Sequence, residues 1–187
     1  MFDKKLYAGG VVFLRPIELA DVSETYVGWL NDSRVNQYLE TRFRVQDLAS
    51  VRDFVEAKRA AGDEYLMAIC LAESGRHIGN IKIGPINPWH LRADLSLFIG
   101  DRDCWGKGVA TAAIHLMVEE AFSGTELHKL CAGVYEGNTG SLSAFKRNGF
   151  EQEGLLRQHF QLNGRWLDGL LLGLTRDAYA QRCCGSE

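Results

Sequence analysis

The segment Trp105-Gly106-Lys107-Gly108-Val109-Ala110-Thr111 decides how this chain is interpreted. It follows an apolar run of strand length at 91–100 and precedes a run at 109–122 whose apolar residues recur with helical period. A glycine turn between a strand and a helix leaves unpaired backbone N–H groups at the helix N-terminus, and their partial positive charge favours a phosphate. The segment therefore predicts an anion site at a strand-to-helix junction.

The spacing of these glycines excludes two common nucleotide-binding motifs. The GxxxxGK[ST] pattern of a P-loop is missing, and GxGxxG fails because Ala110 and Thr111 follow Gly108. A nucleoside triphosphatase is therefore disfavoured. Because a Gly-x-Gly turn alone also fits an ordinary tight turn, the interpretation needs a second motif.

Size and composition fit one globular domain over residues 1–187, since 46% of the residues are hydrophobic and 24% are charged. A formal net charge of -3 gives no reason to expect a nucleic-acid partner. No segment reaches the roughly 18 apolar residues of a membrane span, so we expect a cytoplasmic protein that does not bind membranes. The five cysteines lack metal-ligand spacing, and no metal is expected.

The rest of the chain alternates short strand and helix patterns, which predicts a single α/β domain. The expected strands are 11–14, 65–72, 77–84, 91–100, 128–135 and the two arms of a hairpin at Asn163-Gly164. The expected helices are 22–30, 48–62, 109–122, 139–148 and 176–182. Together they predict a mixed, mostly antiparallel central sheet of about seven strands that is flanked by helices.

A second motif follows downstream, with Asn138-Thr139-Gly140-Ser141 and then Phe145-Lys146-Arg147-Asn148-Gly149-Phe150. In this order the two motifs closely resemble those of the GNAT acetyltransferase superfamily. The closest subgroup looks like the ribosomal-protein N-terminal acetyltransferases and their bacterial amino-sugar-modifying relatives. The resemblance extends over nearly the whole chain and implies a single GNAT domain, acetyl-CoA as cosubstrate and a possible homodimer.

The resemblance also implies which residues hold acetyl-CoA. Phe98, Ile99 and Gly100 would present backbone groups to the pantetheine arm, and Asn138 would contact the same arm. Arg147 would face the nucleotide end, and Phe145 replaces a tyrosine that serves many relatives as general acid. The pyrophosphate would be bound by the loop Gly106, Lys107, Gly108, Val109, Ala110 and Thr111. Each assignment has a purely structural alternative: a buried strand end for 98–100, a tight turn for the glycine loop, and a helix N-cap for Asn138.

Two residues are candidates for the chemistry, because a neutral amine must attack the thioester and a thiolate must leave. Asp94 matches a glutamate that relatives use as base, often through water; the alternative is an outward-facing strand acid paired with Arg92 or another basic residue. Ser141 matches a serine that the ribosomal-protein branch directs toward the CoA sulfur; the alternative is a first-turn capping group. Asp103 stands where the family often has Gln or Arg, which puts a side-chain contact there in doubt.

Aromatic and basic residues in the variable segments are candidates for acceptor binding. They are Arg42, Phe43, Asn87, Trp89, His90 and His159. Arginine can grip a diphosphate and aromatic rings can stack on a base, so a small amine, preferably a nucleotide-linked amino sugar, is the expected acceptor. The alternatives are an N-terminal protein acetyltransferase and a CoA-binding module without turnover.

Overall fold

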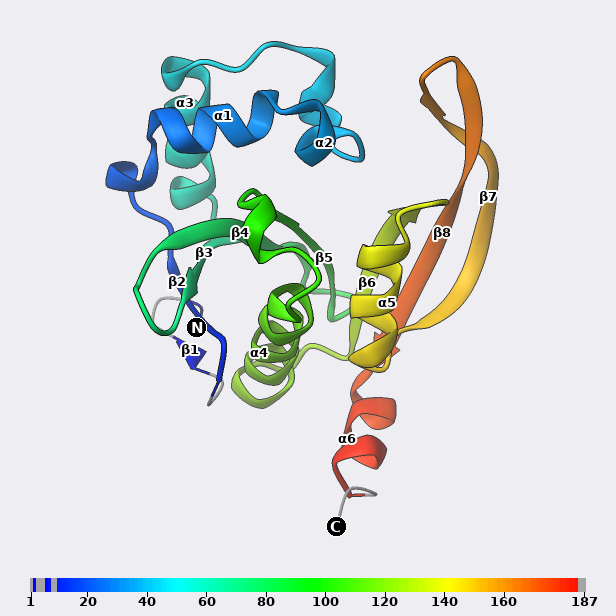
Figure 1. Cartoon of the computed structure of the whole chain (residues 1–187). Helices are drawn as coiled ribbons and strands as arrows, with labels where there is room; N and C mark the ends of the chain where they lie inside the picture. Colours follow the sequence, from blue (N-terminus) through cyan, green and yellow to red (C-terminus); the bar gives the residue numbers. More distant parts are fainter. Residues whose placement is uncertain (1, 3–5, 8–9, 185–187) are drawn as a thin grey trace.

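A computed structural model describes residues 2, 6–7 and 10–184, and Figure 1 shows a central sheet with helices on both faces. The sheet has eight strands in the order β1-β2-β3-β4-β5-β6-β8-β7, and every neighbouring pair is antiparallel except β5 and β6. The mixed α/β sheet is therefore confirmed, with a short additional edge strand.

The elements follow the expected order along the chain. The strands are β1 (Leu6–Tyr7), β2 (Val12–Pro16), β3 (Tyr65–Leu71), β4 (His77–Asn87), β5 (Arg92–Ile99), β6 (Lys129–Tyr135), β7 (Glu151–Leu162) and β8 (Arg165–Thr175). The helices are α1 (Glu24–Asn31), α2 (Ser33–Asn36), α3 (Leu48–Ala60), α4 (Val109–Gly124), α5 (Thr139–Arg147) and α6 (Arg176–Cys184). Short 3-10 turns are η1 (Leu19–Asp21), η2 (Glu40–Phe43) and η3 (Arg102–Cys104).

Each face of the sheet buries its own apolar cluster. Ala93 and Leu95 of β5 point to one face, where they join the buried side chains of α4 such as Ile114. Phe98, which has the opposite parity, packs on the other face against the cluster that α1 and α3 build around Tyr26. Alternation along β5 therefore places Asp94, Ser96 and Phe98 together on the face that carries α1 to α3.

Strand β4 is longer than expected from the sequence, where the segment around Pro85 marked a break. The strand continues to Asn87, because the register shifts between Ile83 and Ile86 and the proline is accommodated in that irregularity. A bulge is one of the few places where a strand tolerates a residue without a backbone N–H.

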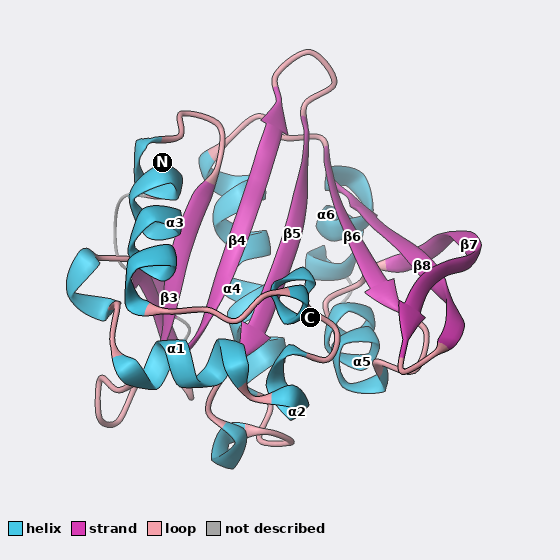
Figure 2. Ribbon diagram, turned by 90° about the horizontal axis from the view of Figure 1, so that it is seen from above, coloured by secondary structure: helices cyan, strands magenta, loops and turns pink. Residues whose placement is uncertain are grey.

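Strands β5 and β6 pair only over three residues, from Arg92 with Lys129 to Asp94 with Cys131. Beyond this point the two strands diverge, as Figure 2 shows. The segments 95–99 and 132–135, which pair with β4 and β8 but not with each other, are here called the β5–β6 split. Backbone groups that no neighbouring strand satisfies need other partners, so the split is suited to holding an extended polar ligand.

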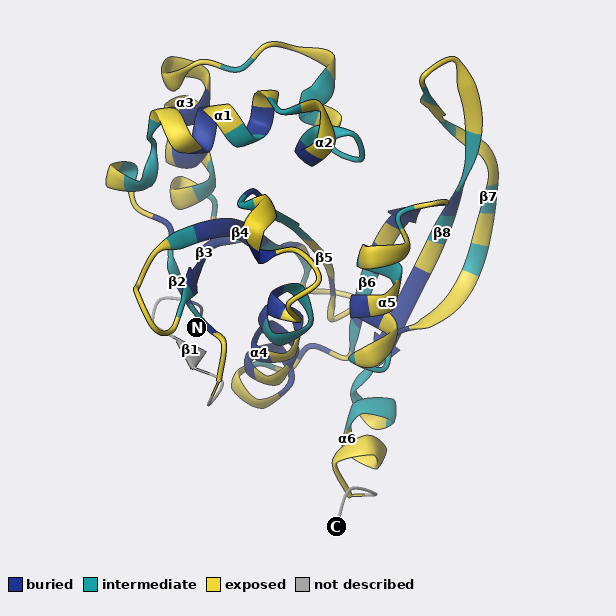
Figure 3. Ribbon diagram, viewed as in Figure 1, coloured by how far each residue is buried: buried dark blue, intermediate teal, exposed yellow. Residues whose placement is uncertain are grey.

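The far end of the sheet is formed by the β7–β8 hairpin, whose outer strand is largely exposed (Figure 3). Its pairing shifts between Leu156 and Phe160, where residues 157–159 of β7 oppose Asp168 alone on β8. Bulges of this kind bend a strand and re-aim its side chains. Among the described residues, no helix has the length and apolar character required to cross a bilayer.

Candidate active site

The glycine turn lies between η3 and α4, at the end of β5 that borders the split. Gly106 and Gly108 adopt φ values of 73° and 78°, in the left-handed region that side chains disfavour. A Cβ added at either position would meet no atom within 4 Å, so both glycines face open space. Gly108 is also the N-cap of α4 and offers no side-chain acceptor to the first-turn amides. These amides and the open space in front of them fit a phosphate group.

The other loop residues differ in what they can offer. Lys107 is exposed, whereas Val109 is only 3% exposed and its side chain belongs to the core. Ala110 and Thr111 are half-buried in the first turn of α4. Val109 can therefore take part in ligand binding only through its backbone. The loop 106–111 can thus offer a ligand its backbone amides more readily than its side chains.

Trp105 ties this loop to the end of β5. Its indole Nε1 donates a hydrogen bond of 2.9 Å to the backbone carbonyl of Ile99. The entry to the loop is held further by Asp101, which accepts from the Asp103 amide at 3.0 Å and pairs with Arg76. No separate role was expected for Trp105, although this residue opens the motif.

The strand-end residues that were expected to contact the pantetheine arm already make some contacts within the protein. Gly100 donates its amide to Ile78 at 2.8 Å, so that group is committed to β4. The Phe98 ring packs into the cluster beneath α1, and Ile99 accepts the Trp105 bond. The absence of a side chain at Gly100 matters for another reason, because the Trp29 ring occupies the space where a Cβ would stand.

Helix α5 borders the other side of the split and begins at Asn138. Asn138 Oδ1 accepts from the Ser141 amide at 3.3 Å, so Asn138 is the helix N-cap, as the structural alternative held. Ser141 is half-buried in the first turn. Phe145 is 2% exposed and its ring lies 5.0 Å from that of Phe150 in an edge-on contact. This burial corrects the expected cofactor contact: Phe145 anchors α5 to the core.

Arg147 lies on the exposed face of α5. It lines a surface cavity of about 390 Å³ together with Lys146, Thr139, Leu142 and Ser143. Its backbone carbonyl accepts from Arg182 at 3.1 Å, while its guanidinium is exposed. Two neighbouring cations beside a cavity on α5 are compatible with the expected contact to the nucleotide end.

Asp94 is the last residue of β5 that pairs with β6, so it lies where the split begins. Its side chain is exposed on the face that carries α1 to α3. Within the described part of the chain Asp94 forms no ion pair, which removes the expected alternative of a partnership with Arg92. A carboxylate in this position is free to accept a proton from a group that reaches the split.

Arg42 reaches the split from η2 but has little free hydrogen-bonding capacity. Its Nη1 donates to the carbonyl of Leu39 at 3.0 Å and to Tyr135 Oη at 2.9 Å, and Nη2 donates to the carbonyl of Gln161 at 3.2 Å. Its side chain is only 12% exposed. The structure thus argues against the expectation that Arg42 grips a diphosphate, because three of its five N–H donors, including both of those on Nη1, already have acceptors within the protein. Phe43 beside it is exposed, with the Arg42 guanidinium over its ring.

The remaining acceptor candidates do not meet at one site. Asn87 accepts the amides of Trp89 and His90 at 3.1 and 2.9 Å and closes the tip of the β4–β5 hairpin. This tip lies at the opposite end of β5 from the glycine turn, roughly 25 Å away at about 3.3 Å per residue. His159 lies instead in the β7 bulge, with its ring 4.7 Å from that of Phe160. The three hairpin residues are therefore removed from the acceptor site.

Two residues near the split were missed in the sequence. The rings of Tyr135 and Phe160 stack 3.6 Å apart at an interplanar angle of 12°. Tyr135 Oη also donates to Glu40 Oε1 at 2.6 Å. Burial, followed by the bond to Glu40, raises the pKa of Tyr135, so the phenol stays protonated and remains a donor. The only signal was an aromatic residue three positions before Asn138.

The glycine turn, the unpaired strands and the free carboxylate agree with a comparison to known families. A family model described as an acetyltransferase (GNAT) domain matches residues 12–151. This chain belongs to the GNAT acetyltransferase family. It is accordingly an acetyltransferase, and acetyl-CoA, the cosubstrate of the GNAT family, fits the cradle formed by Gly106 and Gly108.

Individual relatives of this GNAT acetyltransferase cover nearly its full length. The Bacillus subtilis (strain 168) protein named Probable N-acetyltransferase YjcK is 29% identical over 89% of this chain and 94% of its own. The spermidine N(1)-acetyltransferase of Escherichia coli (strain K12) is 25% identical over 90% of this chain and 88% of its own.

Solved structures confirm the GNAT fold. The Vibrio cholerae spermidine N-acetyltransferase in complex with CoA and spermine has a TM-score of 0.80 at 22% identity, covering 90% of this chain and 98% of the other. Mycobacterium smegmatis RimJ in complex with CoA-disulfide has a TM-score of 0.81 at 23% identity, covering 98% and 95%. The described residues contain no group of His, Cys, Asp or Glu arranged to hold a metal ion.

Proposed function

We propose that this GNAT N-acetyltransferase acetylates the primary amine of a small cationic acceptor that approaches the split past η2. The observation that carries the proposal is the charge on that side. The Glu40 side chain is 72% exposed beside Tyr135, with only a long 4.0 Å ion pair to Arg42, and Asp94 is exposed and forms no ion pair with any residue that the structure describes. The cation that the sequence offered for a phosphate, Arg42, is engaged within the protein. Exposed carboxylates favour a positively charged acceptor.

The nucleotide-linked amino sugar and the N-terminal peptide are the competing acceptors. The amino-sugar interpretation drew on Arg42, Phe43, Trp89 and His90. Arg42 already donates three hydrogen bonds within the protein, and Trp89 and His90 lie at the distant hairpin, which leaves only the exposed Phe43 on η2. The similarity to a spermidine N(1)-acetyltransferase supports an amine that carries further positive charge. Charge and similarity therefore favour the same class of acceptor.

The residues around the split suggest how the reaction would proceed. Acetyl-CoA supplies the acetyl thioester when it is bound. Asp94 would take the proton of the incoming ammonium, directly or through water, because only the neutral amine is nucleophilic. Ser141, in the first turn of α5, would provide the hydroxyl nearest to the departing thiolate. Phe145 has no acidic group, so Ser141 is our candidate for that role.

A panel of acceptors tests the proposal by measuring thiol release from acetyl-CoA. It contains spermidine and simple diamines, peptides with free N-termini and nucleotide-linked amino sugars. We expect the highest kcat/KM with the di- and polyamines. A higher kcat/KM with the nucleotide-linked sugars or the peptides would overturn the proposal, and binding of acetyl-CoA without turnover of any amine would indicate a CoA-binding module.

Three variants make the panel specific. Glu40→Gln should raise the KM for the cationic acceptor several-fold, whereas Glu56→Gln, which removes an exposed carboxylate from α3, should leave it unchanged. Trp89→Ala should likewise leave kcat/KM unchanged, because Trp89 is 89% exposed at the distant hairpin. A loss of activity in Trp89→Ala would return that hairpin to the acceptor site.

A further inference from the structure

Three segments that are distant in sequence meet beside the split. η2 supplies Glu40 and Arg42, the end of β6 supplies Tyr135, and β7 supplies Phe160 and Gln161, which directly follow its bulge. These five residues are here called the clasp. The clasp is the place where the lobe of α1 to α3 contacts the C-terminal hairpin, two parts that Figure 1 shows on opposite sides of the split.

The centre of the clasp is the hydroxyl of Tyr135. It accepts from Arg42 Nη1 at 2.9 Å and donates to Glu40 Oε1 at 2.6 Å. The Arg42 guanidinium carbon also lies 5.1 Å from the centre of the Tyr135 ring. One phenol thus orients both charged residues of η2, and charge-assisted bonds of this kind are stronger than neutral ones.

The bulge in β7 is what brings Phe160 onto Tyr135. Gln158 adopts φ 49°, which is unfavourable for a residue with a side chain. Its backbone N–H donates a hydrogen bond of 2.7 Å to Asp168 Oδ1. Gly169 lies beneath, where a Cβ would come within 2.9 Å of the Phe160 ring. The glycine and the aspartate together allow the bulge to fold over β8 and present Phe160 to the stack.

The clasp does not include any residue of the acetyl-CoA cradle. The glycine turn and the first turn of α4 lie at the end of β5, whereas the clasp joins η2 to the ends of β6 and β7. A change in the clasp should therefore alter the acceptor side of the split and leave the donor side intact. This separation provides a kinetic signature that a general loss of stability would not produce.

We infer that Arg42 and Tyr135 are positioning residues, which hold η2 against the β7 bulge and so fix the acceptor side of the split during acetyl transfer. The inference rests on the proposed function in one respect, namely that the acceptor enters past η2. It does not depend on the charge of the acceptor. Glu40 is oriented by the same hydroxyl, so its carboxylate is held in place although most of its surface is exposed.

The variant Tyr135→Phe tests the inference, because it keeps the stack on Phe160 and removes only the hydroxyl. Tyr38→Phe is the matched control, since the Tyr38 ring lies 5.6 Å from that of Tyr135 but its hydroxyl is not part of the clasp. Steady-state kinetics are measured with the acceptor that the wild type turns over best, together with amide hydrogen exchange over residues 39–43.

In Tyr135→Phe we expect the acceptor KM to rise about 5- to 10-fold, which corresponds to the loss of roughly one strong hydrogen bond. The KM for acetyl-CoA should stay within twofold, and exchange over 39–43 should accelerate. Tyr38→Phe should change none of these. Arg42→Gln should reproduce the acceptor effect, and the double variant should be less than additive, because both single changes break the same bond.

Several results would overturn the inference. An unchanged acceptor KM with faster exchange would reduce the clasp to a structural contact. An equal rise in both KM values with a lower Tm would indicate general destabilisation. Unchanged exchange would show that the hydroxyl does not hold η2. If the wild type acetylates no amine at all, both the proposed function and this inference fail. Activity on an uncharged acceptor would contradict the proposed function alone.

Discussion

The indole of Trp29 covers Gly100 so closely that a Cβ at position 100 would lie 2.1 Å from Trp29 Cδ2. This contact joins α1 to the strand end that precedes the glycine turn. Gly100→Ala should therefore displace Trp29 and lower the free energy of unfolding by about 1–3 kcal/mol, the usual cost of overpacking. Denaturant unfolding measures the change. Gly62→Ala, where a Cβ would meet no atom within 4 Å, is the control and should have little effect.

Gly108 should be essential for acetyl-CoA affinity rather than for stability alone. Gly108→Val would place a branched side chain in the open space before α4 and strain a left-handed backbone by roughly 1–2 kcal/mol. We expect at least a tenfold weaker affinity for CoA by calorimetry. Gly75→Val is the matched control, since Gly75 has φ 70° and equally open surroundings in the β3–β4 turn. Equal affinity in both folded variants would remove the glycine turn from the site.

Asp94→Asn should slow turnover at neutral pH. The difference in turnover between Asp94→Asn and wild type should become smaller as the pH rises, because an amine that is already deprotonated no longer needs a base. A pH profile of kcat/KM from pH 6 to 10 measures this. Asp63→Asn, another exposed aspartate, should follow the wild type throughout. Parallel profiles for Asp94→Asn and wild type would exclude a role for Asp94 as base.

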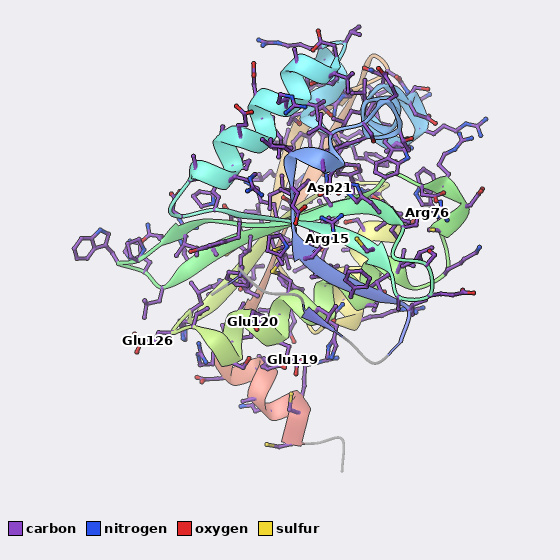
Figure 4. All side chains as sticks on the ribbon, turned by 90° about the vertical axis from the view of Figure 1, so that its left-hand side faces the viewer. Arg15, Asp21, Arg76, Glu119, Glu120 and Glu126 are labelled. Atoms are coloured by element: carbon purple, nitrogen blue, oxygen red, sulfur yellow. The ribbon has the colours of Figure 1, made fainter. Side chains whose placement is uncertain are left out.

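Asp21 should make stability depend on pH in the acidic range. Its carboxylate accepts from Arg15 at 2.5 and 2.7 Å and from the Glu18 amide at 2.8 Å; Figure 4 shows Arg15 and Asp21 next to each other. Burial tends to raise the pKa of Asp21, but these bonds and the charge of Arg15 outweigh it and lower the pKa.

A lowered folded-state pKa means that the stabilisation is complete above the unfolded pKa of about 3.9 and is lost as the pH falls through the folded value. Asp21→Asn should therefore be less stable than wild type at pH 7, and the difference should shrink below about pH 4. Urea unfolding of both proteins at pH 7 and at a pH below about 4 measures this difference in stability. A difference that does not change with pH would mean that the charge of Asp21 contributes nothing.

Most of the fold could be predicted because its signals are local. The period of the apolar residues in α4, the hairpin at Asn163-Gly164 and the Asn138 cap each depend on a few neighbouring positions. β4 was underestimated because Pro85 is normally a strand breaker and only its bulge reveals how it is tolerated. Local chemistry thus predicted the elements and the glycine turn between β5 and α4, where we propose that acetyl-CoA binds.

The acceptor side could not be predicted in the same way. Arg42 and Tyr135 are 93 residues apart, and no pattern in either segment indicates that they meet. Asn87, Trp89 and His90 have suitable side chains, but only the direction of β5 shows that they lie at the opposite end of the sheet. Side-chain chemistry can suggest candidates, whereas their meeting depends on topology.

The three-residue seam between β5 and β6 also bears on how the chain folds. On one side of it, β2 to β5 pair in sequence order; on the other, β6, β7 and β8 pair within a short stretch. Contacts that are close in sequence form fastest, so each half should assemble early, and the seam, which requires the crossover through α4, should form last. Destabilising the seam should therefore speed unfolding more than it slows refolding.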